Sequence, residues 1–210
     1  MRRIVDLTLT LDSNMRGVDI QQAKTLEVEG WNAKRIELYS HCGTHMDAPR
    51  HFVAGGDTID HVDLAACIGR ARVVDLTPIE PGTFIKVEHL GRAADEIAPG
   101  DRLLLRTDWH RRHGTPAYRD ALPRIDVELA RWLVDRGVAL LGVEPPSVAD
   151  VNSREELTTV HQVLLGGGIV IVEGLAHLDQ LDAPIVELIV LPLKVLDGDG
   201  APARAVAILS

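Results

Sequence analysis

Short apolar runs dominate the chain, and most of them have the length of β-strands. From Val5 to Leu11, apolar residues alternate with polar ones, which is the period of a strand with one buried face. Other runs, such as Ile169 to Val172, are continuously apolar, as in strands that are buried on both faces. The predicted strands lie at residues 5–11, 35–39, 72–76, 102–106, 138–143, 169–172, 185–193 and 204–209.

Helical patterns are fewer, and capping residues mark them. Asp126 is a candidate N-cap of one helix, and Ser153 lies three residues before Glu156, which is the spacing of a capping box. Gly91 interrupts a weaker pattern. The predicted helices lie at residues 87–97, 127–136 and 153–165. Helices between strands predict a mixed α/β fold with a mixed sheet, in a single domain over residues 1–210.

Composition and charge exclude several classes of protein. The 210 residues include 22 Lys and Arg against 31 Asp and Glu, which gives a formal net charge of −9, and 46% are hydrophobic. This is ordinary globular usage, and the acidic balance argues against nonspecific nucleic-acid binding, which depends on basic residues. No apolar run reaches the roughly 18–20 residues that span a bilayer. The first residues carry no export signal, so we expect a cytoplasmic protein with no membrane partner.

The cysteines also bear on the compartment. Cys42 and Cys67 are too few for a disulfide framework. We expect both to be reduced thiols, and a single disulfide between them is the alternative.

The segment at residues 41–52 carries the densest candidate chemistry, the pattern His-x-x-x-His-x-Asp-x-x-x-His. His41 and His45 are four residues apart, a spacing that brings two side chains to one side of a helix or a curled loop. Asp47 adds a carboxylate that can bridge two metals. Imidazole and carboxylate are the usual ligands of Zn²⁺ and similar ions. Glycine and proline disfavour a regular helix here, so we expect a loop after the strand at residues 35–39.

Three ligands do not complete a two-metal site, and the sequence offers two further donors. His161 lies in a predicted helix among apolar residues, where a charged imidazole is costly. Glu173 follows the apolar strand at residues 169–172. It is either a solvated strand end or a buried acid that needs a partner.

The other histidines favour ordinary roles. His61 opens an amphipathic stretch, and we expect it to be a surface or core residue. His110 and His113 lie in an Arg-rich polar loop, where we expect them to be solvated. His89 and His177 have no evident partner in the sequence.

The histidine segment resembles a known family signature. Residues 41–52 read His-x-Gly-Thr-His-x-Asp-x-Pro-x-His-Phe, which is similar to the signature of the cyclase family. Bacterial kynurenine formamidases and isatin hydrolases belong to that family. The resemblance continues in the family's order over nearly the whole chain. The further matching segments are 104–107, 142–148, the pair His161 and Glu173, 191–194 and 198–205.

The resemblance implies a fold, a cofactor and an assembly. The implied fold is the swivelling β/β/α type, with a mixed sheet and flanking helices. The implied cofactor is a pair of divalent metal ions, usually zinc and in some members manganese. The implied assembly is a homodimer or larger homo-oligomer, and the implied partner is a small-molecule substrate.

The resemblance also implies a role for each candidate ligand. His41, His45 and Asp47 would hold one metal, with Asp47 also touching the second. His161 would bind the second metal, and Glu173 would be shared between both.

The resemblance assigns His51 as the catalytic acid/base. Two metals lower the pKa of a bridging water, and the resulting metal-bound hydroxide attacks a carbonyl at neutral pH. The ordinary pKa of histidine, about 6.5, suits both taking a proton and delivering it to the leaving nitrogen. We expect Thr44 to support the loop by hydrogen bonds.

Two departures from the kynurenine formamidase pattern affect the substrate. Those enzymes usually carry a tryptophan near an early Pro-Gly-Asp turn, whereas residues 11–17 contain none and Trp31 is the first. Their usual Asp-Thr-Pro-Ser stands here as Glu-Pro-Pro-Ser at residues 144–147. Both departures weaken the case for N-formylkynurenine and for a place in tryptophan catabolism.

The sequence therefore predicts an arylformamidase-like hydrolase that cleaves a C–N bond other than a peptide bond. The predicted substrate is a small formamide or cyclic amide. A lactone hydrolase or cyclase on the same metal site is the first alternative. A metal-binding protein without catalytic activity is the second.

Overall fold

The computed structural model describes residues 2–209, and its centre is an eight-stranded sheet. The strand order is β1-β12-β11-β5-β7-β9-β10-β4. Strands β5, β7, β9 and β10 run parallel, and the other pairings are antiparallel, so the sheet is mixed. The strands are β1 (Arg3–Asp6), β4 (His45–Asp47), β5 (Ile68–Asp75), β7 (Arg102–Arg106), β9 (Leu140–Val143), β10 (Val170–Glu173), β11 (Ile185–Pro192) and β12 (Gly200–Leu209).

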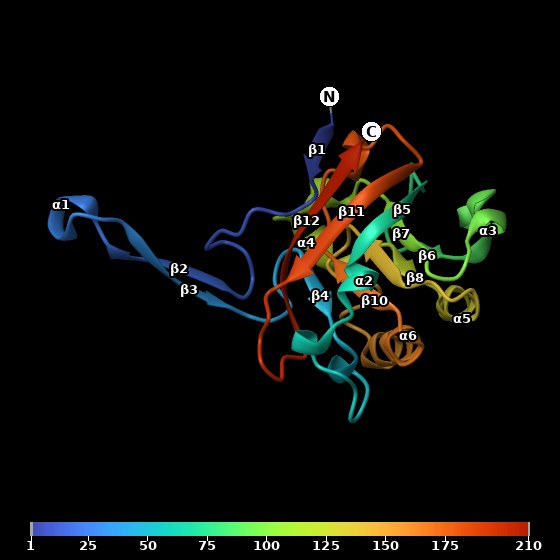
Figure 1. Cartoon of the computed structure of the whole chain (residues 1–210). Coiled ribbons are helices and arrows are strands. Elements are labelled where there is room, and N and C mark those ends of the chain that lie inside the picture. Colours follow the sequence, from blue (N-terminus) through green and yellow to red (C-terminus); the bar gives the residue numbers. More distant parts are fainter. Residues whose placement is uncertain (1, 210) are drawn as a thin grey trace.

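The sheet closes on itself through β12, its longest strand (Figure 1). The first residues of β12, Gly200 to Pro202, pair with β4, which also pairs with β10. Further along, β12 pairs with β11 and β1. The strands from β12 round to β4 therefore form a barrel-like ring, and β4 is the strand that completes it.

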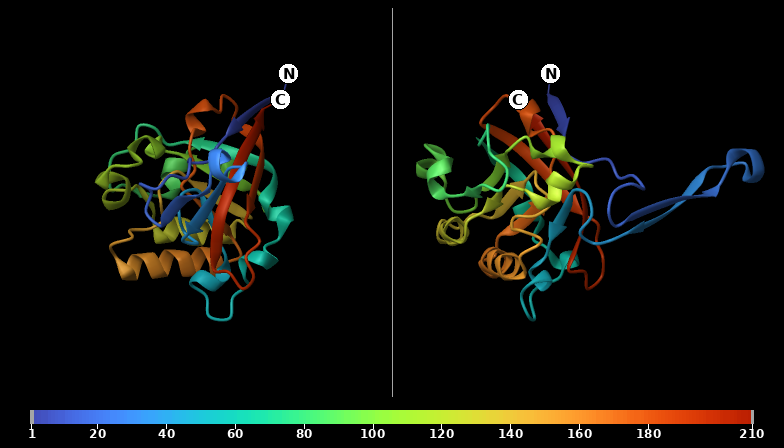
Figure 2. Two further views of the ribbon diagram at one scale, coloured as in Figure 1. Left: turned by 90° about the vertical axis from the view of Figure 1, so that its left-hand side faces the viewer. Right: turned by 180° about the vertical axis from the view of Figure 1, so that it is seen from behind.

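The apolar runs are continuous because both faces of these strands are buried. Leu104 of β7 packs in the core inside the ring, whereas Leu103 and Leu105 pack in a second core on the outside. The outer core lies under α5 (Val127–Asp135) and α6 (Arg154–Gly166), which run across that face (Figure 2). Alternate alanines of β12 face inward, and their small side chains suit a narrow interior.

The two longer helices begin where the sequence predicts. The Asp126 carboxylate accepts a hydrogen bond from the Glu128 amide at the start of α5. The Ser153 hydroxyl accepts from the Glu156 amide at the start of α6. The capping box is only half formed, because the Glu156 side chain accepts from the Asp150 amide instead.

The prediction of a single helix at residues 87–97 is wrong. It divides into two short turns, η3 (Val87–Leu90) and α3 (Ala93–Glu96). The break lies at Gly91, whose φ of 52° favours glycine and ends the first turn.

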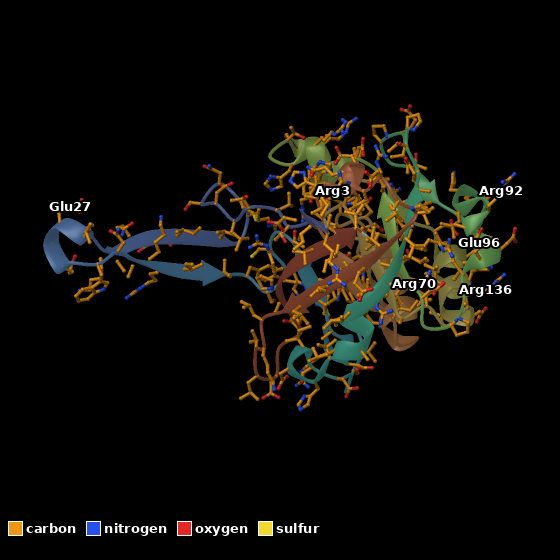
Figure 3. All side chains as sticks on the ribbon, turned by 45° about the horizontal axis from the view of Figure 1, so that its top comes forward. Arg3, Glu27, Arg70, Arg92, Glu96 and Arg136 are labelled. Atoms are coloured by element: carbon orange, nitrogen blue, oxygen red, sulfur yellow. The ribbon has the colours of Figure 1, made fainter. Side chains whose placement is uncertain are left out.

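A long hairpin arm projects from the barrel (Figures 1 and 2). It consists of β2 (Val18–Lys24), β3 (Ala33–Leu38) and, at the tip, α1 (Leu26–Glu29). Figure 3 shows Glu27 at this tip and the side chains of the arm standing clear of the body. The predicted strand at 35–39 thus exists as β3, but it belongs to the arm and not to the central sheet.

The predicted strand at 5–11 is also shorter than its pattern. Val5 and Leu7 are buried as the alternation predicts, but regular pairing ends at Asp6, and Thr8 forms one isolated bridge with Leu175. The remaining elements are η1 (Pro49–His51), η2 (Ile59–His61), α2 (Leu64–Cys67), β6 (Phe84–Ile85), η4 (Trp109–Arg112), α4 (Pro116–Asp120), β8 (Arg124–Ile125) and η5 (Leu178–Gln180). Both cysteines are free and buried, as expected. Within residues 2–209, no helix has the length and apolar character of a membrane span.

Candidate metal centre

The register of β4 against β10 brings the candidate residues together. Glu173 lies directly opposite His45, and Asp47 lies opposite Ile171. Met46 and Val172 point into the core inside the ring, so their neighbours His45, Asp47 and Glu173 point outward. The expected loop therefore ends at Thr44, because residues 45–47 form the strand that closes the barrel.

Helix α6 supplies the remaining predicted donor from above this face. His161 Nε2 lies 3.4 Å from Glu173 Oε1 and 3.6 Å from Asp47 Oδ2. His45 Nε2 lies 3.3 Å from Glu173 Oε2 and 3.5 Å from Asp47 Oδ1. All four side chains are buried. Glu173 is thus the buried acid with partners, and not the solvated strand end.

His41 reaches the same carboxylate from the loop before β4. Its Nδ1 lies 2.8 Å from Asp47 Oδ1, and its Nε2 lies 3.1 Å from Asp199 Oδ2. A Cβ atom on Gly200 would lie only 2.6 Å from His41 Cε1, so glycine is needed there to make room for the ring.

Backbone carbonyls fix the orientation of two imidazoles. His161 Nδ1 donates to the Leu157 carbonyl at 2.7 Å, and His45 Nδ1 donates to the Gly43 carbonyl at 3.0 Å. Each ring therefore turns its Nε2 to the carboxylates, as metal-ligating histidines do. The Thr44 hydroxyl donates to the Gly174 carbonyl at 2.5 Å and accepts from the Leu9 amide at 2.9 Å. The predicted support of the loop by Thr44 is confirmed.

The donors fit divalent cations. Three overlapping sets of ligand atoms converge here, each within 4.8 Å. Two of them include Asp47, one with His41 and His45 and the other with His161 and Glu173, and the third joins His41, His51 and Asp199. In tetrahedral coordination with bonds of roughly 2.0–2.1 Å, neighbouring ligand atoms are about 3.3–3.4 Å apart, close to the Nε2-to-oxygen separations above. Asp47 Oδ2 is buried and makes no hydrogen bond within residues 2–209. A cation would satisfy that oxygen.

The histidines and carboxylates of the cluster shift one another's pKa values. Burial lowers the pKa of His41, but hydrogen bonds to Asp47 and Asp199 outweigh it and raise that pKa to about 9. Burial is likewise outweighed at His45 and His161, where nearby carboxylates raise the pKa. Burial raises the pKa of Glu173, but hydrogen bonds and charges from His161 and His45 lower it by more than burial raises it. The carboxyl is therefore ionised. Metal binding must therefore displace protons from histidine.

His51 lies beside the cluster without forming part of either donor set around Asp47. Its ring stacks on His41, with centroids 3.8 Å apart and planes 22° apart, and its Nδ1 lies 3.6 Å from Asp199 Oδ2. Burial lowers the pKa of His51. The negative charge of Asp47 raises that pKa in part, whereas His41 and His161 lower it further. His51 is thus neutral at neutral pH and borders the cavity above the cluster.

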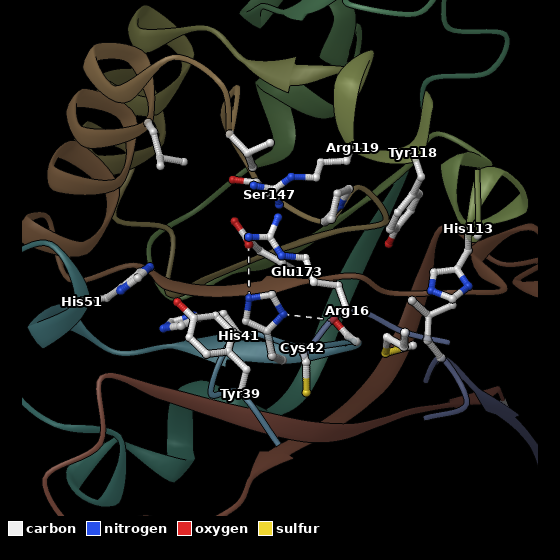
Figure 4. A pocket seen from close by; sticks show the side chains of 18 of the residues that line it. Arg16, Tyr39, His41, Cys42, His51, His113, Tyr118, Arg119, Ser147 and Glu173 are labelled. Carbon is white, nitrogen blue, oxygen red and sulfur yellow. Dashed lines mark hydrogen bonds and ion pairs between the residues drawn. The ribbon is translucent and has the colours of Figure 1, made fainter. Parts of the chain in front are cut away.

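That cavity has a volume of about 560 Å³, and four donors of the cluster line it: His41, His45, His161 and Glu173 (Figure 4). Tyr39 and Phe52 give it aromatic walls, and Arg16 and Arg119 also line it. Within the described part of the chain, neither arginine forms an ion pair. Burial lowers the pKa of Arg119, and the charge of Arg16, which lines the same cavity, lowers it further.

Comparisons with known proteins place the chain in a family. Residues 5–150 match the sequence model of the family described as "Putative cyclase". The chain is 37% identical over 178 residues to a kynurenine formamidase of Salinibacter ruber (strain DSM 13855 / M31), covering 83% of this chain and 79% of the relative. The chain belongs to the cyclase family.

Solved structures agree with this assignment. Isatin hydrolase A from Labrenzia aggregata, bound to benzyl benzoate, is 28% identical with a TM-score of 0.88, over 99% of this chain and 94% of that one. A structure titled "The Structure Of Potential Metal-Dependent Hydrolase With Cyclase Activity" is 25% identical with a TM-score of 0.81, over 99% and 98%. The predicted mixed α/β fold of the cyclase type is confirmed.

The cyclase signature does not account for every group at the site. Asp199 contacts His41 and lies near His51, yet no role was predicted for it. The only signal was its position in the Gly-Asp-Gly turn at residues 198–200. The arginines of the cavity were also missed, because nothing in their sequence neighbourhood points to the cluster.

The other histidines divide into two groups. His61 is exposed, as expected, and His113 lines the cavity. The expectation of a solvated His110 is wrong, because its side chain is only 9% exposed and its Nδ1 lies 2.7 Å from Glu144 Oε1. His110 also approaches His177, with ring centroids 5.1 Å apart.

Proposed function

We propose that this protein is a metal-dependent hydrolase that cleaves the C–N bond of a small formamide or cyclic amide. The observation that carries the proposal is that two sets of donors share Asp47, and that the other four members of these sets line a cavity. Membership of the cyclase family supports the enzyme class, a hydrolase acting on C–N bonds other than peptide bonds. Relatives named kynurenine formamidase and isatin hydrolase support the same class.

The donors suit two divalent cations. His41, His45 and Asp47 would hold one cation, and His161 would hold the other, with Asp47 and Glu173 shared. Nitrogen and carboxylate donors favour zinc, and manganese is the alternative. When bound, such ions lower the pKa of a water molecule and polarise a carbonyl oxygen.

His51 moves the protons in this proposal. Because the ring is neutral at neutral pH and borders the cavity, it can accept a proton from the attacking water. The resulting imidazolium then delivers that proton to the leaving nitrogen as the C–N bond breaks. Stacking on His41 holds the ring in place, and the nearby Asp199 carboxylate favours its charged form.

The cavity wall narrows the substrate class. Arg16 and Arg119 line the cavity without carboxylate partners among residues 2–209, which favours a substrate with an anionic group away from the scissile bond. The exposed Arg16 can move to meet such a group, whereas Arg119 is half-buried. A carboxylate-bearing formamide fits this arrangement better than a neutral one does.

A substrate panel tests the proposal, measured with zinc-loaded, manganese-loaded and chelator-treated protein. It contains N-formylkynurenine, aryl formamides with and without a carboxylate, isatin, a cyclic imide and a lactone. Metal-dependent turnover of a formamide or cyclic amide supports the proposal. Turnover of the lactone alone overturns it in favour of a lactone hydrolase or cyclase. Bound metal with no turnover overturns it in favour of a metal-binding protein.

The arm supports a second proposal, that the protein is a homodimer or larger homo-oligomer. An isolated two-stranded hairpin is marginally stable in water. Yet the arm exposes large apolar side chains, among them Val28 at 80%, Trp31 at 58% and Ile36 at 55%. We infer that the arm packs against a second copy of this chain.

Light scattering during size-exclusion chromatography tests the assembly. Trp31→Ser combined with Val28→Asp is expected to shift the protein towards a monomer. Leu196→Asp is the matched control, because Leu196 is as exposed as Val28 but lies on the body. A monomeric wild type, or an assembly that both variants leave unchanged, contradicts the proposal.

A further inference from the structure

A second histidine–carboxylate cluster lies away from the candidate metal centre. His110, in η4, faces His177 and Asp179, which lie at the start of η5. One ligand atom from each of the three lies within 4.8 Å of the others. None of these residues lines the cavity above the first cluster, and the hydrolytic chemistry uses none of them.

The orientation of His110 is fixed from behind by Glu144. This carboxylate is fully buried, and its Oε2 accepts from the Thr107 and Trp109 amides at 2.7 and 3.3 Å. Glu144 Oε1 lies 2.7 Å from His110 Nδ1, so that nitrogen donates. A carboxylate behind the imidazole is the usual outer partner of a metal-ligating histidine, and it leaves Nε2 free for the ion.

Asp179 presents a bare oxygen to that nitrogen. Its Oδ1 lies 3.7 Å from His110 Nε2, too far for a hydrogen bond. This oxygen is buried and has no hydrogen-bond partner within residues 2–209. Arg111 holds the other oxygen, Oδ2, at 2.9 Å and thereby fixes the carboxylate. The 3.7 Å between His110 Nε2 and Asp179 Oδ1 is close to the separation of two ligand atoms bound to one ion.

We propose that His110, His177 and Asp179 bind a divalent cation of the zinc class. Two histidines and one carboxylate are a common three-residue donor set for zinc. Arg111 pairs with both Asp179 and Asp108, and Glu144 forms no ion pair with an arginine within residues 2–209, which leaves negative charge for a cation to neutralise. His177 is partly exposed, so water can complete the coordination.

The position of this site indicates a structural role. The ion would tie η4 to η5, two segments far apart in the sequence. The chain leaves η4 directly towards His113, Tyr118 and Arg119, which line the cavity. The second ion would therefore brace one wall of the cavity without touching the substrate.

The competing explanation is an ion pair. A protonated His110 between Glu144 and Asp179 would satisfy the same charges and would require nothing of His177. The two explanations therefore differ at His177. His177→Asn is the informative variant, because His177 has a φ of 60° that asparagine tolerates and because its side chain is partly exposed.

The experiment counts bound zinc after equilibrium dialysis, by elemental mass spectrometry, in wild type, His177→Asn and the control His89→Asn. His89 is another exposed histidine, outside both clusters. We expect His177→Asn to bind one zinc equivalent fewer than wild type and the control. Zinc should also raise the melting temperature of His177→Asn less than that of wild type. Equal zinc content in all three proteins overturns the proposal and leaves the ion pair, whether or not the protein proves to be a hydrolase.

Discussion

The two histidine–carboxylate clusters differ in what surrounds them. The first stands on β4, β10 and α6, and its donors converge on Asp47 and line a 560 Å³ cavity. The second joins two short turns, and one of its two histidines, His110, is backed by a fully buried carboxylate. Both offer nitrogen and oxygen donors to a cation. Only the first also offers room for a carbonyl compound and a neutral histidine beside it, so only the first can carry chemistry.

Removing the shared carboxylate of the first cluster should have the largest effect. Asp47→Asn weakens both donor sets at once, so we expect bound metal to fall and kcat/KM to drop at least about 1,000-fold. The corresponding loss of one donor in the second cluster, His177→Asn, should lower kcat/KM less than about tenfold. Zinc content and steady-state kinetics of both variants check this contrast. Similar losses in the two variants would contradict it.

Replacing the proton carrier should separate chemistry from metal binding. His51→Gln is expected to keep the metal of the first cluster and to lose about 100- to 10,000-fold in kcat, because general acid–base catalysis is lost. His113→Gln, at another histidine of the cavity wall, is the matched control and should lose far less. Metal content measured beside kcat decides the role. If metal and activity fall together in His51→Gln, His51 is a ligand and not the acid/base.

The zinc affinity of the first cluster should depend on pH, because zinc must displace protons that its histidines hold. The pKa of His41 is raised to about 9 in the metal-free protein, so at neutral pH a proton occupies the site that zinc requires. Zinc affinity of the first cluster should therefore rise at least about tenfold per pH unit from near neutrality up to about pH 9, and then level off. Competition with a chromophoric chelator across this range measures it. A flat profile would show that no proton is displaced.

Among the variants at the first cluster, the one at the Asp199 carboxylate should have the smallest effect. Asp199→Asn removes the negative partner of His41 and the charge near His51 without removing a donor of either Asp47 set. Partners in this position typically contribute 10–100-fold in activity or metal affinity, and we expect the lower end, about tenfold. The acidic limb of the kcat/KM profile should move to lower pH, because the imidazolium of His51 loses a stabilising charge. An unchanged profile would make Asp199 only a structural neighbour.

Much of the fold could be predicted because burial on both faces leaves a clear pattern. The continuous apolar runs of β7, β9 and β10 reflect two cores, and the caps of α5 and α6 lie where Asp126 and Ser153 predict them. The arm could not be recognised, because β3 alternates like a sheet strand although it is not part of the central sheet. Nothing local distinguishes a strand that pairs in the barrel from one that pairs only in a hairpin.

The candidate metal centre was predictable in part for a similar reason. Three of its donors lie within seven residues, so their spacing is visible. The strand character of His45 to Asp47 was not, because long-range pairing with β10 and β12 creates it. Asp199 meets His41 across 158 residues, and His110 meets Glu144 across 34. Such contacts depend on the closed barrel and leave no local pattern.

The central claim is that the Asp47 cluster holds the metal on which C–N hydrolysis depends. Its most direct test follows zinc occupancy and formamide turnover together while metal-free protein is titrated with zinc, with Asp47→Asn treated in parallel. We expect turnover to rise in proportion to zinc occupancy of the first cluster, and we expect the variant to gain neither bound zinc nor turnover. Full activity in chelator-treated protein, or full metal-dependent activity in Asp47→Asn, would contradict it.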